Sequence, residues 1–225
     1  MKRVFFAVVV VVIFMATQAE AGVRLAGYYD TREQENITVV GYSALPYNFG
    51  VWGFVDFYTN RADSETGIDD EADFTSFYSE ANINFALTKN LKLLLEINDG
   101  SAIPANFRPG LQYWIPVENG TVGVKFAPYR IDLVQLDPEP DPSGQIGLAW
   151  RFDFLEKKVF FEGFAEINWR YGDHQDDFYP FITEPQLGVN LSKNMAILIE
   201  YRYSALNPVT KEADEGWGIG AEYRF

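Results

Sequence analysis

Apolar and polar side chains alternate along the chain from residue 23 to the C-terminus. In the final stretch, EGWGIGAEYRF (215–225), one parity carries Trp217, Ile219, Ala221, Tyr223 and Phe225. The other parity carries glycines, Glu222 and Arg224. A period of two residues is typical of a β-strand with one apolar face, because successive side chains point to opposite sides of the sheet. The pattern therefore predicts an all-β chain.

The alternation divides into twelve segments of about 9 to 14 residues, the length that a tilted strand needs to cross a bilayer. Strands are expected near 23–31, 36–44, 50–59, 74–87, 91–99, 107–117, 121–131, 144–154, 159–171, 178–191, 195–206 and 215–225. Three prolines, Pro109, Pro128 and Pro185, fall inside these strands. Each proline removes a ladder donor, so each is expected to mark a bulge or a rim.

The connections between the expected strands alternate between two kinds. Short links such as Thr88-Lys89-Asn90 follow the even strands, and mostly longer, acidic links such as NRADSETGIDDEAD (60–73) follow the odd ones. The first odd link, REQEN, is short. Short periplasmic turns that alternate with longer external loops are typical of outer-membrane barrels. An even strand count also places both ends of the barrel on the periplasmic side.

The parity pattern indicates which face meets lipid. In the strand at 195–206, Met195, Ile197 and Ile199 share one face, whereas Glu200 and Arg202 lie on the other. In water, such an apolar outer face on strand after strand would promote aggregation. In hydrocarbon it is the solvent contact, and closing the ladder satisfies every backbone group. A soluble barrel with an apolar interior is the alternative, but the charged face would make a poor core. We therefore expect a twelve-stranded antiparallel transmembrane β-barrel of the bacterial outer membrane.

Residues 1–21, MKRVFFAVVVVVIFMATQAEA, have the features of a signal peptide, with two basic residues, an apolar run and a small-x-small site at Ala19-Glu20-Ala21. The barrel is then expected over 22–225, and an uncleaved anchor is the alternative. The chain has no cysteine, so a disulfide framework is excluded. Its net charge of −14 repels nucleic acid.

Several stretches resemble the nucleoside-specific outer-membrane channel (Tsx-like) family. They are VVGYSALPYNFGVWGFVDFY (39–58), FFEGFAEINW (160–169), FITEPQLGVNLSKNMAILIEYRYS (181–204) and the closing GWGIGAEYRF. The resemblance implies a monomeric twelve-stranded barrel with a narrow, keyhole-like lumen that passes nucleosides and related small solutes. The chain departs from the nucleoside channel in its shorter loops and fewer lumen tryptophans, so no nucleoside-contacting residue is carried over.

The inward parity carries ionised side chains of both signs. The carboxylates are Asp56, Glu80, Glu96, Asp153, Glu162, Glu166, Glu184, Glu200 and Glu222. The cations are Lys92, Arg108, Lys125, Arg151, Arg170, Arg202 and Arg224. Charges of this kind either line a water-filled pore and set its selectivity or pair across strands and fill the barrel.

Aromatic rings share the inward parity and can stack on flat solutes. With the charges, they give the candidate substrate-binding set: Trp52, Phe54, Asp56, Tyr58, Tyr78, Glu80, Arg108, Trp114, Lys125, Arg151, Phe160, Glu162, Phe164, Glu166, Arg170, Glu184, Glu200 and Arg202. Candidate partners for a ribose are Asn82, Asn84, Gln112, Asn168, Gln186 and Asn190. The alternative is that the inward rings only constrict and rigidify the barrel.

Enzymatic and metal-binding functions have weaker support. The single histidine, His174, lies in GDHQDD between Asp173 and Asp176. Catalysis needs a second, well-placed group, so we expect a solvated acidic loop and no enzyme. Carboxylates at 69–73 are suitable calcium ligands but lack the ordered spacing of an EF-hand loop. We expect no cofactor.

Residues 107–130, FRPGLQYWIPVENGTVGVKFAPYR, also resemble a strand-turn-strand unit of small oligogalacturonate porins. The resemblance implies a lumen lined by tracks of inward arginine. The inward parity here is instead net acidic and repels polyanions. We therefore expect a passive channel for small solutes that prefers cations. A small porin for sugars or sugar acids, or a closed structural or receptor barrel, is the alternative.

The expected partners are outer-membrane lipid, the barrel assembly machinery through the C-terminal Phe225, and a small-molecule solute. No nucleic acid is expected, and the barrel is expected to be a monomer. The residues expected near the membrane interfaces are Trp150, Trp169, Tyr201, Tyr203, Trp217 and Tyr223.

Overall fold

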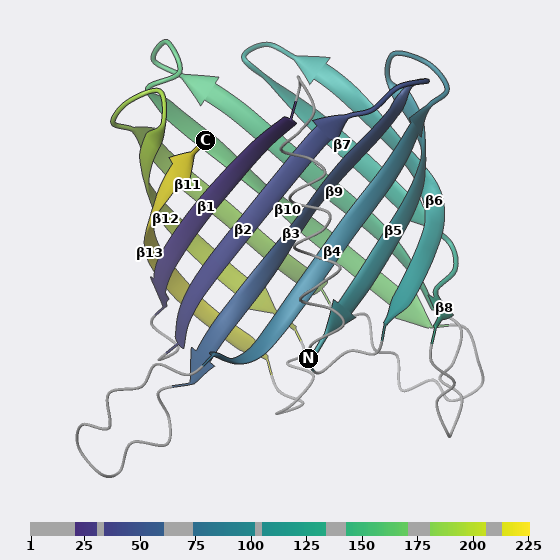
Figure 1. Ribbon diagram of the computed structural model, residues 1–225, viewed down its shortest axis with the longest axis horizontal. Helices are drawn as coiled ribbons and strands as arrows, with labels where there is room; N and C mark the ends of the chain where they lie inside the picture. Colours follow the sequence, from purple (N-terminus) through teal and green to yellow (C-terminus); the bar gives the residue numbers. More distant parts are fainter. Residues whose placement is uncertain are drawn as a thin grey trace.

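The computed structural model describes residues 21–30, 34–60, 74–101, 105–133, 143–170, 181–205 and 213–225. In these ranges the chain forms one antiparallel sheet that curls into a barrel of tilted strands (Figure 1). The first strands are β1 (Ala21–Asp30), β2 (Gln34–Ala44), β3 (Phe49–Asn60), β4 (Phe74–Ala86), β5 (Leu91–Gly100) and β6 (Asn106–Val117). The others are β7 (Gly120–Ala127), β8 (Ile131–Asp132), β9 (Ser143–Phe154), β10 (Val159–Arg170), β11 (Phe181–Asn190), β12 (Met195–Ser204) and β13 (Asp214–Arg224).

The ring closes where the first and last strands meet. β1 pairs with β13, with Arg24 opposite Arg224, and β5 pairs with β6 at the other side of the sheet order. In Figure 1 the purple β1 accordingly lies beside the yellow β13. With the two-residue β8 set aside, twelve long strands form a closed antiparallel barrel, as the alternation predicted.

The barrel has one end with short turns, here called the turn end. It is formed by the links at 45–48, 87–90, 118–119, 155–158 and 191–194, and the C-terminus lies at the same end (Figure 1). These links are tight enough to force non-glycine residues to positive φ, among them Asn48 (66°) and Asn119 (62°). Asparagine tolerates this conformation better than most residues.

Pro128 breaks the strand that was expected over 121–131. The chain forms β7, leaves the ladder at Pro128, and pairs again as β8. The register against β6 shifts by one residue across the break, from Leu111↔Phe126 to Asn106↔Asp132. The bulge expected at Pro128 is therefore confirmed, because proline has no N–H for the ladder.

The other two strand prolines interrupt the ladder less. β11 runs through Pro185, and its pairing with β12 skips Glu184 and Pro185 but keeps the same register on both sides. The expected bulge is thus absent at Pro185. Pro109 pairs with Leu95 on β5, while the ladder between β6 and β7 begins only at Leu111.

Side chains alternate between an apolar outer surface and a mainly polar interior. In β12, Ile197 and Ile199 are each 46% exposed, whereas Leu198 between them is fully buried. In the closing strand, Trp217 is 54% and Phe225 74% exposed. The alternative of a soluble barrel with these rings in an apolar interior is therefore excluded.

All six aromatic residues expected at membrane interfaces lie on outward parities. Their rings pair with outward neighbours: Tyr201 with Trp217 at 5.0 Å, Phe126 with Trp169 at 6.0 Å and Trp150 with Phe161 at 5.9 Å. Two of these pairs join adjacent strands, and Phe126 with Trp169 reaches across β9, so the rings also reinforce the wall.

The expected signal peptide lies outside the described residues except for Ala21, which opens β1. The loop at 172–177 and the calcium candidates at 69–73 also lie outside them. In the described ranges, no helix is long and apolar enough to cross a membrane. The same ranges contain no group of three or more His, Cys, Asp or Glu that could hold a metal ion.

Candidate channel lumen

The lumen wall contains the residues that the inward parity predicted. Of the eighteen candidates, Arg170 lies in β10 but its side chain is outside the described set. In the described ranges the inward side carries eleven carboxylates and eight cations, because Asp132 and Asp214 join the nine predicted carboxylates and Arg24 and Arg130 join six of the predicted cations. Apart from the pair of Arg130 and Asp132 beside β8, the ion pairs fall into three groups at different places on the wall.

The first group, here called the lysine cluster, consists of Lys125 with Glu80, Glu96, Glu166 and Arg108. Lys125 Nζ lies 2.5 Å from Glu96 Oε2 and 2.6 Å from Glu166 Oε1. Glu80 Oε1 is 4.0 Å from the same ammonium, and Arg108 lies 3.2 Å from Glu96. Lys125 on β7 thus connects β4 and β5 with β10. The Glu96 side chain is completely buried, and a buried carboxylate needs such partners.

Neutral side chains saturate the carboxylates of the lysine cluster. Asn98 donates to Glu96 at 2.8 Å, Asn82 to Glu80 at 2.6 Å and Gln145 to Glu166 at 2.7 Å. Tyr78 donates to Asn98 at 2.7 Å and so extends the network along β4 and β5. These hydrogen bonds stabilise the ionised carboxylates inside the barrel.

The second group, here called the arginine bridge, joins two parts of the wall that are not adjacent. Arg24 Nη1 on β1 lies 2.7 Å from Glu162 Oε1 on β10. Three strands, β13, β12 and β11, separate β1 from β10 around the ring, so this pair crosses the interior. Arg151 also binds Glu162 at 2.6 Å, and Glu222 lies 3.1 Å from Arg24.

Arg24 was not among the candidates predicted from sequence. Its parity signal is present, because it lies between the outward Val23 and Leu25 in the first strand. A systematic reading of that strand would have found it. Its partner could not have been found, since Glu162 is 138 residues away in the sequence.

Beside the arginine bridge lies a small apolar cluster of Ala26, Phe160, Ala196 and Leu198. Phe160 can lie there because its neighbour on β11 is Gly188, where an added Cβ would stand 2.1 Å from the ring. The guanidinium of Arg151 lies 4.5 Å from the ring centroid and that of Arg224 5.3 Å from it. These are cation–π distances.

Phe160 was predicted as an inward ring that a solute could stack on. The ring is inside the barrel, but it is fully buried. It therefore offers no free face, and its position corresponds to the constricting alternative instead.

The third group lies deeper along β3, β11 and β12 and is acidic. Asp56 accepts hydrogen bonds from Thr38 at 2.5 Å and Tyr58 at 3.1 Å. Arg202 binds Glu200 and lies 3.9 Å from Glu184. One arginine thus lies among three carboxylates. Gln186 bridges Tyr28 at 2.6 Å and Glu200 at 2.9 Å.

Three of the predicted rings form a continuous aromatic wall on β3 and β4. Trp52 and Phe54 have ring centroids 5.5 Å apart, and Phe54 and Tyr78 5.7 Å apart. Trp114 lies on another wall, over Gly123, where an added Cβ would be 2.9 Å from the indole. Phe164 has the inward parity of its neighbours Glu162 and Glu166 on β10.

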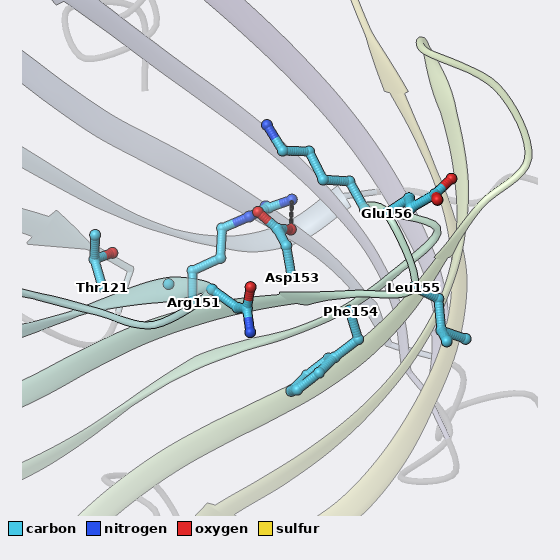
Figure 2. A pocket seen from close by; sticks show the side chains of 9 residues that line it. Thr121, Arg151, Asp153, Phe154, Leu155 and Glu156 are labelled. Atoms are coloured by element: carbon cyan, nitrogen blue, oxygen red, sulfur yellow. Dashed lines mark hydrogen bonds and ion pairs between the residues drawn. The ribbon is translucent and has the colours of Figure 1, made fainter.

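Two cavities open at the turn end, on different parts of the wall. One, ≈ 610 Å³, is lined by Thr121, Arg151, Asp153 and the turn at 154–157. Figure 2 shows Arg151 paired with Asp153 there, while the Phe154 ring points away from the pair. The other, ≈ 650 Å³, is lined by Tyr42, Trp52, Asn84, Lys92 and the turn at 45–49.

Comparison with known proteins defines the class of fold. No protein-family model matches the chain, and no curated protein matches it. Among solved structures, the KdgM porin is similar, with a TM-score of 0.55, 13% identity, and coverage of 91% of this chain and 99% of that one. The same values hold for the KdgM porin in complex with disordered oligogalacturonate. The chain therefore has the fold of outer-membrane porin barrels.

A further solved structure that matches is the translocator domain of the autotransporter NalP from Neisseria meningitidis. Its TM-score is 0.49 at 11% identity, and the match covers 97% of this chain and 95% of that one.

Proposed function

We propose that the protein is a passive channel for small solutes in the bacterial outer membrane. The observation that carries the proposal is the division of the wall, with Ile197, Ile199 and Trp217 outside and ionised side chains inside. An apolar outer face suits acyl chains, and a mixed-charge inner face suits water and polar solutes. Passive diffusion needs no cofactor and no covalent chemistry.

The contacts across the lumen favour small cargo. The arginine bridge joins β1 to β10, and Phe160 fills the space beside it. The lysine cluster crosses the interior between β4 and β10, and both described cavities open at the turn end. A barrel of this strand number with such internal contacts suits single small molecules better than polymers.

Nucleoside-like solutes are the leading cargo. The resemblance to the Tsx-like family supports this proposal, and the aromatic wall of Trp52, Phe54 and Tyr78 suits a flat base. Asn82 and Asn84 lie beside this wall and carry amides that suit ribose hydroxyls. Neutral sugars or sugar acids are the second candidate, since the KdgM porin with its oligogalacturonate complex is a structural neighbour.

Charge favours cations over anions in the lumen. Eleven described inward carboxylates face eight cations, and the acidic group around Arg202 contributes most of the excess. A net acidic wall raises the local concentration of cations and repels polyanions.

Two measurements on the purified mature barrel test the proposal. Liposome swelling with nucleosides, neutral sugars and sugar acids of matched size should rank nucleosides first. Planar bilayers under a salt gradient should give a reversal potential of the sign expected for cation preference. Faster swelling with sugar acids than with nucleosides would make sugar acids the leading cargo. Absence of swelling with every solute would leave a closed structural or receptor barrel.

We also propose a role in assembly for the C-terminal residue. The exposed Phe225 at the end of the closing strand is available as the C-terminal recognition residue for barrel assembly. Deleting it should reduce the amount of folded protein in the outer membrane, measured by heat-modifiable migration on gels. The barrel is proposed to be a monomer, which light scattering in detergent would test.

A further inference from the structure

The cavity lined by Tyr42, Trp52, Asn84 and Lys92 contains a charged group, Lys92, that the proposed nucleoside contacts do not involve. It opens at the turn end between β2, β3, β4 and β5 and has a volume of ≈ 650 Å³. That volume lies within the range of about 300 to 1,000 Å³ typical of small-molecule sites.

Lys92 differs from every other inward cation that the structure describes. Each of the others lies within 4.0 Å of at least one carboxylate: Arg24, Arg108, Lys125, Arg130, Arg151, Arg202 and Arg224. Lys92 makes no ion pair with any described residue, although it lines the cavity. An ammonium without a counter-ion beside a cavity is a binding group for an anion.

Two further groups of the cavity are available to a ligand. Trp52 is 37% exposed and contacts Phe54 with its ring, so part of its indole faces open space. Asn84 is 8% exposed, and its Oδ1 has no hydrogen-bond partner in the described part of the chain. A buried acceptor without a donor is unfavourable, so a hydroxyl that reached it after a small turn of the amide would be stabilised.

The cavity at the other wall lacks these features. Its cation, Arg151, already pairs with Asp153 at 3.2 Å and with Glu162 at 2.6 Å. Figure 2 shows the pair with Asp153. A new anion there would compete with two carboxylates. Of the two cavities, only the Lys92 cavity therefore has a cation that makes no ion pair with a described residue.

We propose that the Lys92 cavity binds a small monoanion built on a hydroxylated ring. Its carboxylate pairs with the Lys92 ammonium, its ring lies on the exposed face of Trp52, and a hydroxyl donates to Asn84. The site lies at the turn end, away from the acidic group around Arg202, so local anion binding is compatible with cation preference in the lumen. It does not depend on permeation.

Calorimetric titration of the full-length protein in detergent tests the site. The probes are D-glucuronate with its neutral counterpart D-glucose, and 4-hydroxybenzoate with phenol. Each acid is expected to bind about tenfold more tightly than its neutral counterpart, the effect of one charge-assisted contact. The two pairs distinguish a saturated sugar ring from a flat aromatic ring.

Substitutions localise the binding. Lys92→Gln should abolish the tenfold preference for the acid, whereas Lys92→Arg should keep most of it. Lys89→Gln changes an exposed lysine in the adjacent turn and should leave the preference unchanged. Benzoate, which lacks the ring hydroxyl, should bind more weakly than 4-hydroxybenzoate, and Asn84→Ala should remove this difference.

Three results would overturn the proposal: equal affinity for acid and neutral probes, no binding of either acid, or an unchanged preference in Lys92→Gln. Heat-modifiable migration shows whether each variant is folded. Permeation is measured separately by liposome swelling, so a barrel that binds the acids without transporting any solute would contradict the channel but not this site.

Discussion

The two sides of the arginine bridge are filled in opposite ways. Near the turn end of β10 and β12, Phe160 and Leu198 fill the interior by apolar contact, and both are fully buried. The acidic group around Arg202 lies deeper along β11 and β12. On the side of β4 to β10, the lysine cluster closes it with charges, and the Glu96 side chain is just as completely buried. The same barrel geometry therefore supports both an apolar and an ionic filling.

The difference arises at inward positions of the strands. On the apolar side, β11 and β13 have glycines where other strands have long side chains. Gly188 makes room for Phe160, and Gly220 makes room for Tyr28, whose ring would lie 2.7 Å from an added Cβ. On the ionic side the inward positions carry Glu80, Glu96 and Lys125 instead.

The two fillings should respond differently to mutation. An apolar cluster loses contact area in proportion to the atoms removed. An ionic cluster loses more, because removing one partner leaves an uncompensated buried charge. Variants on each side, with outward or exposed controls, test this difference.

The largest effect is expected for Lys125→Ala. It leaves Glu96 and Glu166 without the ammonium that lies within 2.6 Å of both. The free energy of unfolding should fall by about 3–5 kcal/mol, the range for breaking a buried pair. Urea unfolding in lipid vesicles, followed by tryptophan fluorescence, measures it. Lys89→Ala, in an exposed turn, should change stability by less than about 0.5 kcal/mol. A loss below about 1 kcal/mol in Lys125→Ala would mean that the cluster is well hydrated.

The next effect is expected for Leu198→Ala on the apolar side. Leu198 is fully buried, so the truncation should reduce the free energy of unfolding by about 2–5 kcal/mol. The control is its neighbour in the same strand, Ile199→Ala. Ile199 is 46% exposed on the outer face, where lipid can refill the space, so the loss should stay below about 1 kcal/mol. Equal losses at both positions would argue against an outer face in contact with lipid.

The strands and faces of the barrel were predictable from sequence because a period of two residues is a local property. Glu200 and Arg202 lie inside, and Ile197 and Ile199 outside, as their parity indicated. Pro128 also acted locally, through its missing N–H. Closure followed from the need to satisfy every strand edge.

The partners inside the lumen were not predictable in the same way. Whether Arg24 meets Glu162 depends on the stagger between strands around the whole ring, which no single strand encodes. The burial of Phe160 depends on Gly188, a residue of the neighbouring strand that the inward parity alone treats as an empty position. The parity of each strand therefore predicted most of the inward residues. It could not distinguish an aromatic ring exposed to the lumen from one that is buried.

A smaller effect is expected for Gly188→Val, which tests the shape of the apolar side. The new side chain would overlap the Phe160 ring, which lies 2.1 Å from the Cβ position, so the ring must move. Overpacking of this kind should reduce the free energy of unfolding by about 1–3 kcal/mol. The control is Gly27→Val on β1, where an added Cβ meets nothing within 4 Å. A second variant, Gly188→Val with Phe160→Ala, should recover part of the loss. No recovery would mean that Phe160 is not the group displaced.

The smallest effect on stability is expected at the arginine bridge, which divides the two sides. Each member keeps a second partner when the other is removed: Arg24 retains Glu222, and Glu162 retains Arg151. A double-mutant cycle of Arg24→Ala and Glu162→Ala should therefore give a coupling energy of about 1 kcal/mol. Single-channel conductance of the double variant should rise above that of the parent, because the side chains that cross the interior are gone. The charge exchange Arg24→Glu with Glu162→Arg should restore the parental conductance more closely than either single exchange. A coupling energy near 1 kcal/mol with no change in conductance would mean that the bridge does not limit the passage of solutes.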